Sequence, residues 1–175
     1  MTKIDVPGFE ARLADPSEFM KIDALVDRAN EYDYGVQDNS WDDYHTAELR
    51  HGFPLDIWVV YRDNGELVAT ISSRQFGQRA VYEETEPHEM DLRLLAVSPD
   101  ARREGIAAKL MLAIIEHAKK IGFTRLVLKT EQSMHGAHRL YEKLGMQVDE
   151  YRSGIWLEGE KSPDINNVIC YTLDF

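Results

Sequence analysis

One strand–helix–strand segment in the middle of the chain most constrains the fold. The β-prone run Leu92–Val97 ends at residues 98–100, Ser-Pro-Asp, and a stripe of apolar residues with helical spacing follows Gly105. Gly122 is typical of the end of that helix, and the apolar run Leu126–Leu128 predicts the next strand. These elements predict a βαβ unit with a right-handed crossover, so its two strands lie parallel in one sheet.

The rest of the chain adds antiparallel elements. Residues 57–61 and 67–71 are β-prone and flank Asn64-Gly65, the strongest short signal for a hairpin. The polar stretch 79–88 is expected to be a connection. Further helices are expected at residues 17–30, from Asn39 or Ser40 to Arg50, and at 134–144, and further strands at 9–13, 146–151 and 168–175. The pattern predicts an α/β fold with a mixed sheet.

Length and charge narrow the function classes. The 175 residues suit one domain, residues 1–175, and the net charge of −11 opposes binding to nucleic acid or to an anionic membrane. Cys170 is the only cysteine, which excludes an internal disulfide and a thiolate zinc site and suits the cytoplasm. No apolar run reaches the roughly 20 residues of a membrane span. His135 and His138 lack an acidic neighbour placed as in a zinc site, so no metal is expected.

The turn from the strand at 92–97 into the next helix is a candidate anion site. Unpaired backbone N–H groups at a helix start attract a phosphate, and the small Gly105 and Ala107 allow a close approach. Arg102 and Arg103 add positive charge at the same rim. Many such loops bind no phosphate, so the residues alone leave a purely structural turn equally open. No P-loop motif and no GxGxxG motif is present.

Two motifs here resemble those of a known family. Arg102-Arg103-Glu104-Gly105-Ile106-Ala107 resembles the Q/R-x-x-G-x-G/A acetyl-CoA motif of the GNAT family of N-acetyltransferases, with Leu95, Val97 and Pro99 matching upstream. Residues 140–146, Leu-Tyr-Glu-Lys-Leu-Gly-Met, resemble the second signature of that family, L-Y-x-K-L-G-F. The resemblance implies a single-domain GNAT-like fold, in which a mixed, mostly antiparallel sheet of about 6–7 strands is flanked by about four helices.

The resemblance also implies roles for individual residues. Tyr141 would protonate the leaving CoA thiolate, and Met134 stands where the family often has an asparagine that contacts pantetheine, which puts that contact in doubt. The expected contacts to acetyl-CoA are backbone groups in the strand for pantetheine (Leu95, Ala96, Val97) and in the loop for the pyrophosphate (Arg102, Arg103, Gly105, Ile106, Ala107).

The sequence offers more than one candidate for the general base. Some family members use a carboxylate at the position of Asp91, and strand alternation would place Asp91, Arg93, Leu95 and Val97 on one face. Arg93 could then hold Asp91 in an ion pair, and the two interpretations carry equal weight. Glu89 and His88 are alternatives at the strand entrance.

The expected function is transfer of the acetyl group of acetyl-CoA to an amine, either a small molecule or a protein amino group. The alternative is an acyl-CoA-binding regulatory or interaction module without turnover. The expected partners are acetyl-CoA and the amine acceptor, and a homodimer is compatible with this reading. Residues 38–53 and 152–167 are expected to shape the acceptor site, with Trp41 and Trp156 beside acidic residues.

Overall fold

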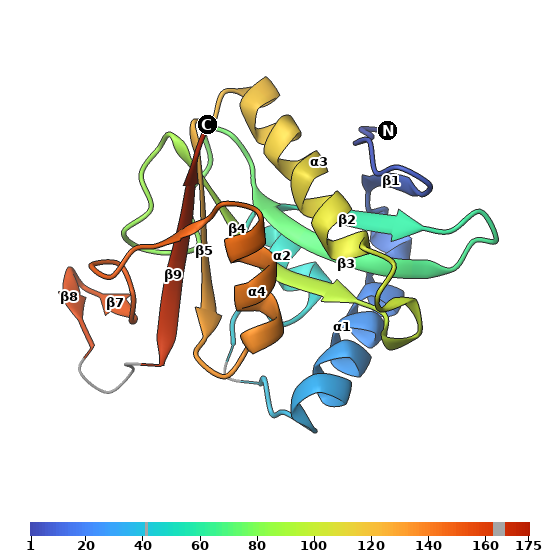
Figure 1. Cartoon of the computed structure of the whole chain (residues 1–175), viewed down its shortest axis with the longest axis horizontal. Coiled ribbons are helices and arrows are strands. Elements are labelled where there is room, and N and C mark those ends of the chain that lie inside the picture. Colours follow the sequence, from blue (N-terminus) through green and yellow to red (C-terminus); the bar gives the residue numbers. More distant parts are fainter. Residues whose placement is uncertain (41, 163–166) are drawn as a thin grey trace.

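The structure is a computed structural model that describes residues 1–40, 42–162 and 167–175 (Figure 1). Trp41, which the sequence places in the acceptor region, and residues 163–166 of the second acceptor segment lie outside the described residues.

A seven-stranded sheet forms the centre of the molecule, in the order β1-β2-β3-β4-β5-β9-β6. β4 and β5 are parallel, as the βαβ unit predicts, and the other neighbouring strands are antiparallel. A two-stranded ribbon, β7–β8, stands apart from this sheet. The strands are β1 (Glu10–Leu13), β2 (Leu55–Tyr61), β3 (Leu67–Arg74), β4 (Glu89–Val97), β5 (Arg125–Glu131), β6 (Gln147–Val148), β7 (Trp156–Leu157), β8 (Glu160–Lys161) and β9 (Val168–Asp174).

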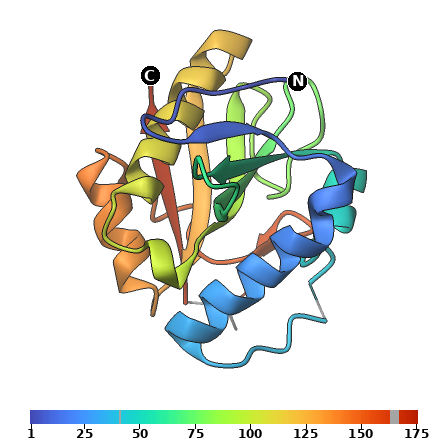
Figure 2. The ribbon, with the colours of Figure 1, turned by 90° about the vertical axis from the view of Figure 1, so that its right-hand side faces the viewer.

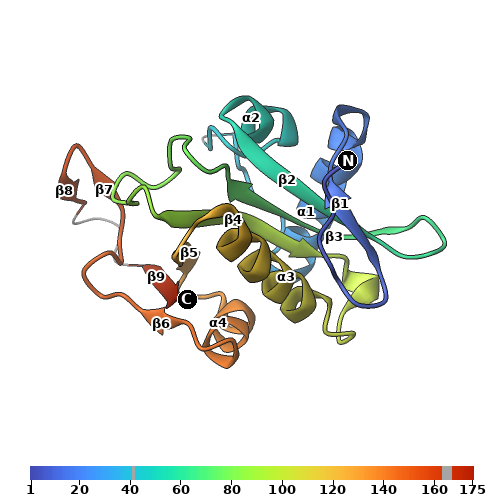
Figure 3. The same cartoon turned by 90° about the horizontal axis from the view of Figure 1, so that it is seen from above.

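Helices cover both faces of the sheet. α1 (Phe19–Tyr34) and α2 (Ala47–Gly52) lie on one face, and α3 (Ile106–Ile121) and α4 (His135–Lys143) lie on the other (Figure 3). Figure 2 shows α1 and α3 on opposite sides of the strands. The predicted mixed, mostly antiparallel sheet with four flanking helices is confirmed for the described residues.

The apolar stripe of α3 builds the larger part of the core. Ile106, Leu110 and Ile114 are buried on that stripe and pack in one cluster with Leu92 of β4 and Leu128 of β5. Their burial fixes α3 across the two parallel strands. Consequently the start of α3 lies beside the end of β4. None of the helices in the described ranges is both long enough and apolar enough to cross a membrane.

Two expected elements differ from the structure. The predicted helix from Asn39 or Ser40 to Arg50 is wrong, because α2 begins only at Ala47. Thr46 is the N-cap of α2, and its hydroxyl accepts a hydrogen bond from Leu49 N. The preceding residues form turns whose carbonyls at Tyr44 and His45 accept bonds from buried Arg50. The strand expected at 146–151 is shorter, with only Gln147 and Val148 paired to β9.

Candidate active site

The two parallel strands separate partway along their length. β4 and β5 pair from Glu89–Arg125 to Leu92–Leu128, but β4 continues to Val97 and β5 to Glu131. Figure 1 shows the two arrows diverging beyond this point. We call this opening the fork. Its sides are strand edges that carry backbone N–H and C=O groups, so an extended ligand with its own amides can pair with them.

A β-bulge lies on β4 just inside the fork. Ser72 of β3 faces Arg93 and Thr70 faces Ala96, so two residues of β4 oppose Ile71 alone. Leu94, in the bulge, has φ of +52°, a conformation that an L-residue with a side chain adopts rarely.

The bulge changes which way the β4 side chains point. Leu95 and Val97 pack with the α3 side of the core, whereas Leu94 packs with Val26 and Ala29 of α1. The prediction that Asp91, Arg93, Leu95 and Val97 share one face is therefore wrong. Simple alternation fails because the bulge inserts one residue between Arg93 and Ala96.

The loop after β4 leads into the α3 N-terminus at the mouth of the fork. Gly105 is the N-cap with φ of +72°, and no side chain caps the first N–H groups of this 16-residue helix. Ile106 is buried beneath the loop, and Ala107 leaves the first turn uncrowded. These N–H groups remain free for an anion.

The two arginines of this loop have different surroundings. Arg102 donates from Nε to Val97 O at 3.1 Å and from both terminal nitrogens to the Asp33 carboxylate at 3.0 Å. It therefore ties the loop to β4 and α1 rather than offering free charge. Arg103 is exposed with φ of +67°, and within the described chain it forms no ion pair. Arg103 is the arginine whose charge is available to a phosphate.

Tyr141 projects from α4 into the core and is 7% exposed. Its ring lies 5.5 Å from that of Tyr171. Burial, with smaller contributions from Tyr34 and Tyr171, raises the pKa of Tyr141 to about 12. The phenol thus stays protonated at neutral pH and can act as a donor.

Met134 is the N-cap residue of α4. Its sulfur accepts a hydrogen bond from the Thr130 hydroxyl at 3.4 Å, near the end of β5. The side chain is thus engaged with the strand that forms one side of the fork.

Asp91 is almost completely buried, with 1% of its surface exposed. Its Oδ2 accepts bonds from Val81 N at 2.6 Å and Tyr82 N at 3.2 Å, while Oδ1 is buried with no partner among the described residues. Burial raises the pKa of Asp91 to about 6, although the backbone bonds and the Arg74 charge act in the opposite direction. A carboxyl group with this pKa can accept a proton near neutral pH.

Of the two interpretations of Asp91, the one in which Arg93 holds it in an ion pair is wrong. The Arg93 guanidinium bonds to Asp42 and lies 5.2 Å from the centre of the Tyr44 ring. Asp42 and Tyr44 come from the connection between α1 and α2, which the sequence only marked as acidic and aromatic. Glu89, an alternative base, has both carboxylate oxygens occupied by Arg125, Arg152 and a backbone N–H.

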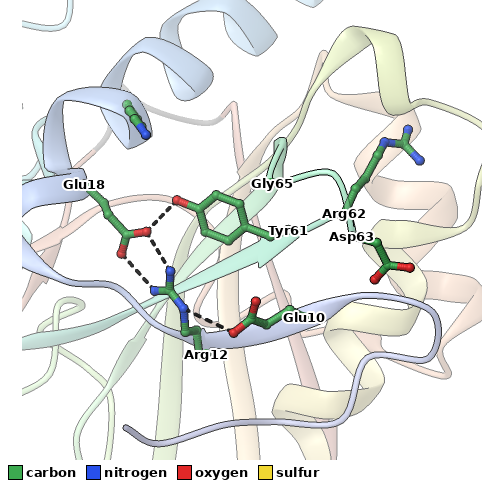
Figure 4. Close-up of a pocket in the computed structure, with 8 residues that line it drawn as sticks. Glu10, Arg12, Glu18, Tyr61, Arg62, Asp63 and Gly65 are labelled. Carbon is green, nitrogen blue, oxygen red and sulfur yellow. Dashed lines mark hydrogen bonds and ion pairs between the residues drawn. The ribbon is translucent and has the colours of Figure 1, made fainter.

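Two polar hollows lie on the surface of the described part of the chain. One, of about 410 Å³, lies at the β1–β2 edge (Figure 4). There Arg12 bonds both oxygens of Glu18 and Tyr61 donates to the same carboxylate at 2.5 Å. These groups satisfy one another, and the bond from Arg12 helps to hold the pKa of Glu18 near 2, so this cluster is structural.

The second hollow, of about 390 Å³, lies between α1 and the α1–α2 connection. Its lining includes the carboxylates of Asp27 and Glu31. Across the described ranges no group of three or more His, Cys, Asp or Glu side chains is placed to hold a metal ion.

Comparison of the sequence with known families and proteins identifies one family. The sequence model of the Acetyltransferase (GNAT) family matches residues 22–146. The alanine N-acetyltransferase of ribosomal protein bS18 from Escherichia coli K12 is 31% identical over 104 residues, which cover 58% of this chain and 70% of that protein. The uncharacterized N-acetyltransferase YjgM, also from E. coli K12, is 31% identical over 121 residues, or 69% of this chain and 67% of that protein.

Solved structures share the fold at low sequence identity. A GNAT-family acetyltransferase from Staphylococcus aureus Mu50 aligns with a TM-score of 0.73 and 14% identity, covering 95% of this chain and 98% of that one. The acetyltransferase yncA from Salmonella typhimurium, solved with acetyl-CoA, aligns with a TM-score of 0.63 and 17% identity, covering 95% and 93%. The chain belongs to the GNAT family of acetyltransferases and is an enzyme that transfers the acetyl group of acetyl-CoA to an amine acceptor.

Proposed function

We propose that acetyl-CoA lies in the fork and that the acetyl group passes directly to the amine in a ternary complex. The main support for this placement is that the part of β4 beyond its pairing with β5 leads directly into the loop at the N-terminus of α3. The pantetheine amides would pair with backbone groups of Leu95, Ala96 and Val97. The pyrophosphate would lie on the N–H groups of the loop at residues 103–107, beside Arg103. Holding both substrates together replaces a collision with an oriented attack.

The reaction needs one proton removed and one supplied. The amine lone pair attacks the thioester carbonyl carbon, and the C–S bond breaks to release the CoA thiolate. The nitrogen loses a proton to a base, and the sulfur gains one from an acid. Exchange with water then returns both enzyme groups to their starting states.

Asp91 is the proposed base. Its Oδ2 is held by two backbone N–H groups, which leaves the unpartnered Oδ1 to take the proton directly or through a water. The pKa of about 6 keeps the carboxylate largely ionised at pH 7 while it remains basic enough to accept a proton. The absence of a bond to Arg93 removes the main reason to treat Asp91 as half of an ion pair.

Tyr141 is the proposed acid. Its pKa of about 12 exceeds that of an alkyl thiol, about 8.5 for cysteine. The phenol therefore stabilises the developing thiolate first by a hydrogen bond, and complete proton delivery follows as the product leaves.

The acceptor is proposed to be an amine that is cationic in solution, either a small molecule or a protein amino group. The net charge of −11 and the acidic hollow beside α1 attract such a group. The relative from E. coli K12 that is named for an alanine of ribosomal protein bS18 supports including peptides with a free α-amino group. The buried single thiol of Cys170 suits the cytoplasm as the place of action.

The decisive experiment measures CoA release from acetyl-CoA with a panel of amines that includes polyamines, amino acids and short peptides. Release well above the uncatalysed rate with at least one amine is expected. Tight acetyl-CoA binding by calorimetry with no release for any amine would instead favour a binding module without turnover.

A further inference from the structure

The hydroxyl of Tyr82 lies at the inner end of the fork. It donates to Leu92 O at 3.0 Å and accepts from Lys129 N at 3.3 Å. Leu92 pairs with Leu128 in the last β4–β5 pair, and Lys129 is the first β5 residue beyond that pairing. A side chain from the connection between β3 and β4 thus reaches the point where the two strands part.

The two bonded groups belong to the end of the parallel ladder. In a parallel pair, the carbonyl of one residue faces the N–H one position past its partner, so Leu92 O and Lys129 N face each other. The phenol oxygen serves both, because it carries one donor and two acceptor lone pairs. The pairing of Leu92 with Leu128 includes a backbone bond at this point, so the phenol bridge is added to the last hydrogen bond of the ladder.

Neighbouring residues hold Tyr82 firmly in place. The Asp91 carboxylate bonds the backbone N–H groups of Val81 and Tyr82. Arg74 bonds the carbonyls of Gln78 and Glu86 in the same connection. On the other side the Lys129 ammonium lies 5.4 Å from the centre of the Tyr82 ring and pairs with Glu84. The phenol therefore has little freedom to leave the bridge.

We infer that Tyr82 is a positioning residue that fixes where the acyl groove ends. The inference rests on the proposed placement of acetyl-CoA in the fork. The bridge sets the spacing of β4 and β5 two residues before the bulge at Leu94. It thereby sets how deeply the thioester enters and how the carbonyl meets the amine. Tyr82 itself touches neither substrate.

The test compares Tyr82→Phe with Tyr61→Phe. The first change keeps the ring and its contact with Lys129 but removes the bridge. Tyr61→Phe also removes a tyrosine hydroxyl that donates a hydrogen bond, in this case to Glu18. The Tyr61 hydroxyl lies at the β1–β2 edge, outside the fork. A similar loss of thermal stability in both variants separates positioning from a general loss of folding.

Tyr82→Phe is expected to lower kcat by about 10- to 100-fold, because small displacements of reacting groups have effects of that size. KM for acetyl-CoA should stay within about twofold, since the pyrophosphate loop is unchanged. Tyr61→Phe should keep the wild-type kcat. In labelled protein, the scalar coupling across the bond between Lys129 N and Leu92 C=O should be weaker in the wild type than in Tyr82→Phe, because the phenol oxygen shares that N–H.

Two results would overturn the bridge: equal couplings in the wild type and in Tyr82→Phe, or a kcat for Tyr82→Phe equal to that of Tyr61→Phe. A separate measurement tests the placement of the substrate. Added CoA should shift the backbone amide signals of residues 94–97 and 103–107 in the wild type. If those signals do not move, the fork assignment fails. If they move and Tyr82→Phe retains full kcat, only the role of Tyr82 fails.

Discussion

One physical effect, burial, raises the pKa of Asp91 and of Tyr141, which makes the proposed base stronger and the proposed acid weaker. Burial raises the pKa of both groups, to about 6 for the carboxyl and about 12 for the phenol. The carboxyl started far below neutral pH, so the shift brings it into the range of a useful base. The phenol started above neutral pH, so the shift only secures its proton.

Asp91→Asn should remove the acid limb of the pH–rate profile. In the wild type, kcat/KM should fall tenfold per pH unit below about pH 6, because only the carboxylate can take the proton. The acceptor amine contributes its own limb, which is the same in both proteins. The asparagine oxygen can still accept the bonds from Val81 and Tyr82, so the fold should persist. An unchanged profile and rate would show that Asp91 is structural.

The same pKa shift should appear in the stability of the wild type. The folded pKa of about 6 lies above the ordinary value of 3.8, so between these values the folded state binds more protons than the unfolded state. Stability should therefore fall by about 2 kcal/mol as pH rises from 4 to 6. Denaturant unfolding of wild type and Asp91→Asn at both pH values isolates this contribution, which the asparagine variant should lack.

Tyr141→Phe should lower kcat by at least about tenfold while acetyl-CoA affinity stays nearly constant, because the hydroxyl acts on the leaving sulfur. Tyr171→Phe is the matched control. That hydroxyl belongs to a ring beside Tyr141 but bonds Glu142. Rapid-quench measurement gives the rate constant of the chemical step without the contribution of product release. Equal rate constants for the two variants would remove Tyr141 from the mechanism.

At the scale of elements, the site arises where β4, β5 and α3 meet. The apolar stripe of α3 holds the helix across both strands, so its free N-terminal N–H groups lie beside the end of β4. The bulge at Leu94 lies between these groups and the paired part of the strands. A helix start, a strand edge and a bulge thus adjoin in the groove that is proposed to bind acetyl-CoA.

Gly105→Glu should weaken CoA binding by more than about tenfold, because it places a carboxylate at the pyrophosphate site and raises the cost of the positive φ. Gly77→Glu is the control, because Gly77 also has a positive φ, +80°, and equally open surroundings. Gly77 lies far from the proposed pyrophosphate site, since the adjacent Phe76 packs against Gly122 at the opposite end of α3. Calorimetry with both folded variants should show lost affinity only for Gly105→Glu. Undiminished affinity would place the pyrophosphate elsewhere.

At the scale of the whole molecule, the net charge of −11 acts on the acceptor and on acetyl-CoA with opposite signs. The overall field attracts a cationic amine, whereas binding of the anionic cofactor is proposed to depend on local groups, the helix start and Arg103. The acidic hollow lined by Asp27 and Glu31 places part of that charge near α1.

Raising ionic strength should therefore lower kcat/KM for a cationic amine several-fold while changing it little for an acceptor without net charge. Steady-state rates at about 0.05 and 0.5 M salt, at saturating acetyl-CoA, measure this. The double variant Asp27→Asn with Glu31→Gln should reduce the salt effect. Equal salt dependence for charged and neutral acceptors would exclude electrostatic attraction of the amine.

The sequence by itself determined the βαβ unit, the turn that leads into α3 and the family. These depend on local patterns: an apolar stripe on α3, Gly105 at a helix start, and Tyr141 within a continuous motif. The position of the hairpin at Asn64-Gly65 was likewise local.

Only the tertiary structure decided the partners of Asp91, Arg93 and Arg102. A single bulge reversed the expected alternation on β4. Arg93 bonds Asp42, which is 51 residues away in the sequence. Arg102 is neutralised by Asp33, and Tyr82 reaches the fork from a connection with no regular pattern. The physical reason is that periodicity and motifs report neighbours along the chain, whereas hydrogen-bond partners and pKa values depend on which distant segments the folded core brings together.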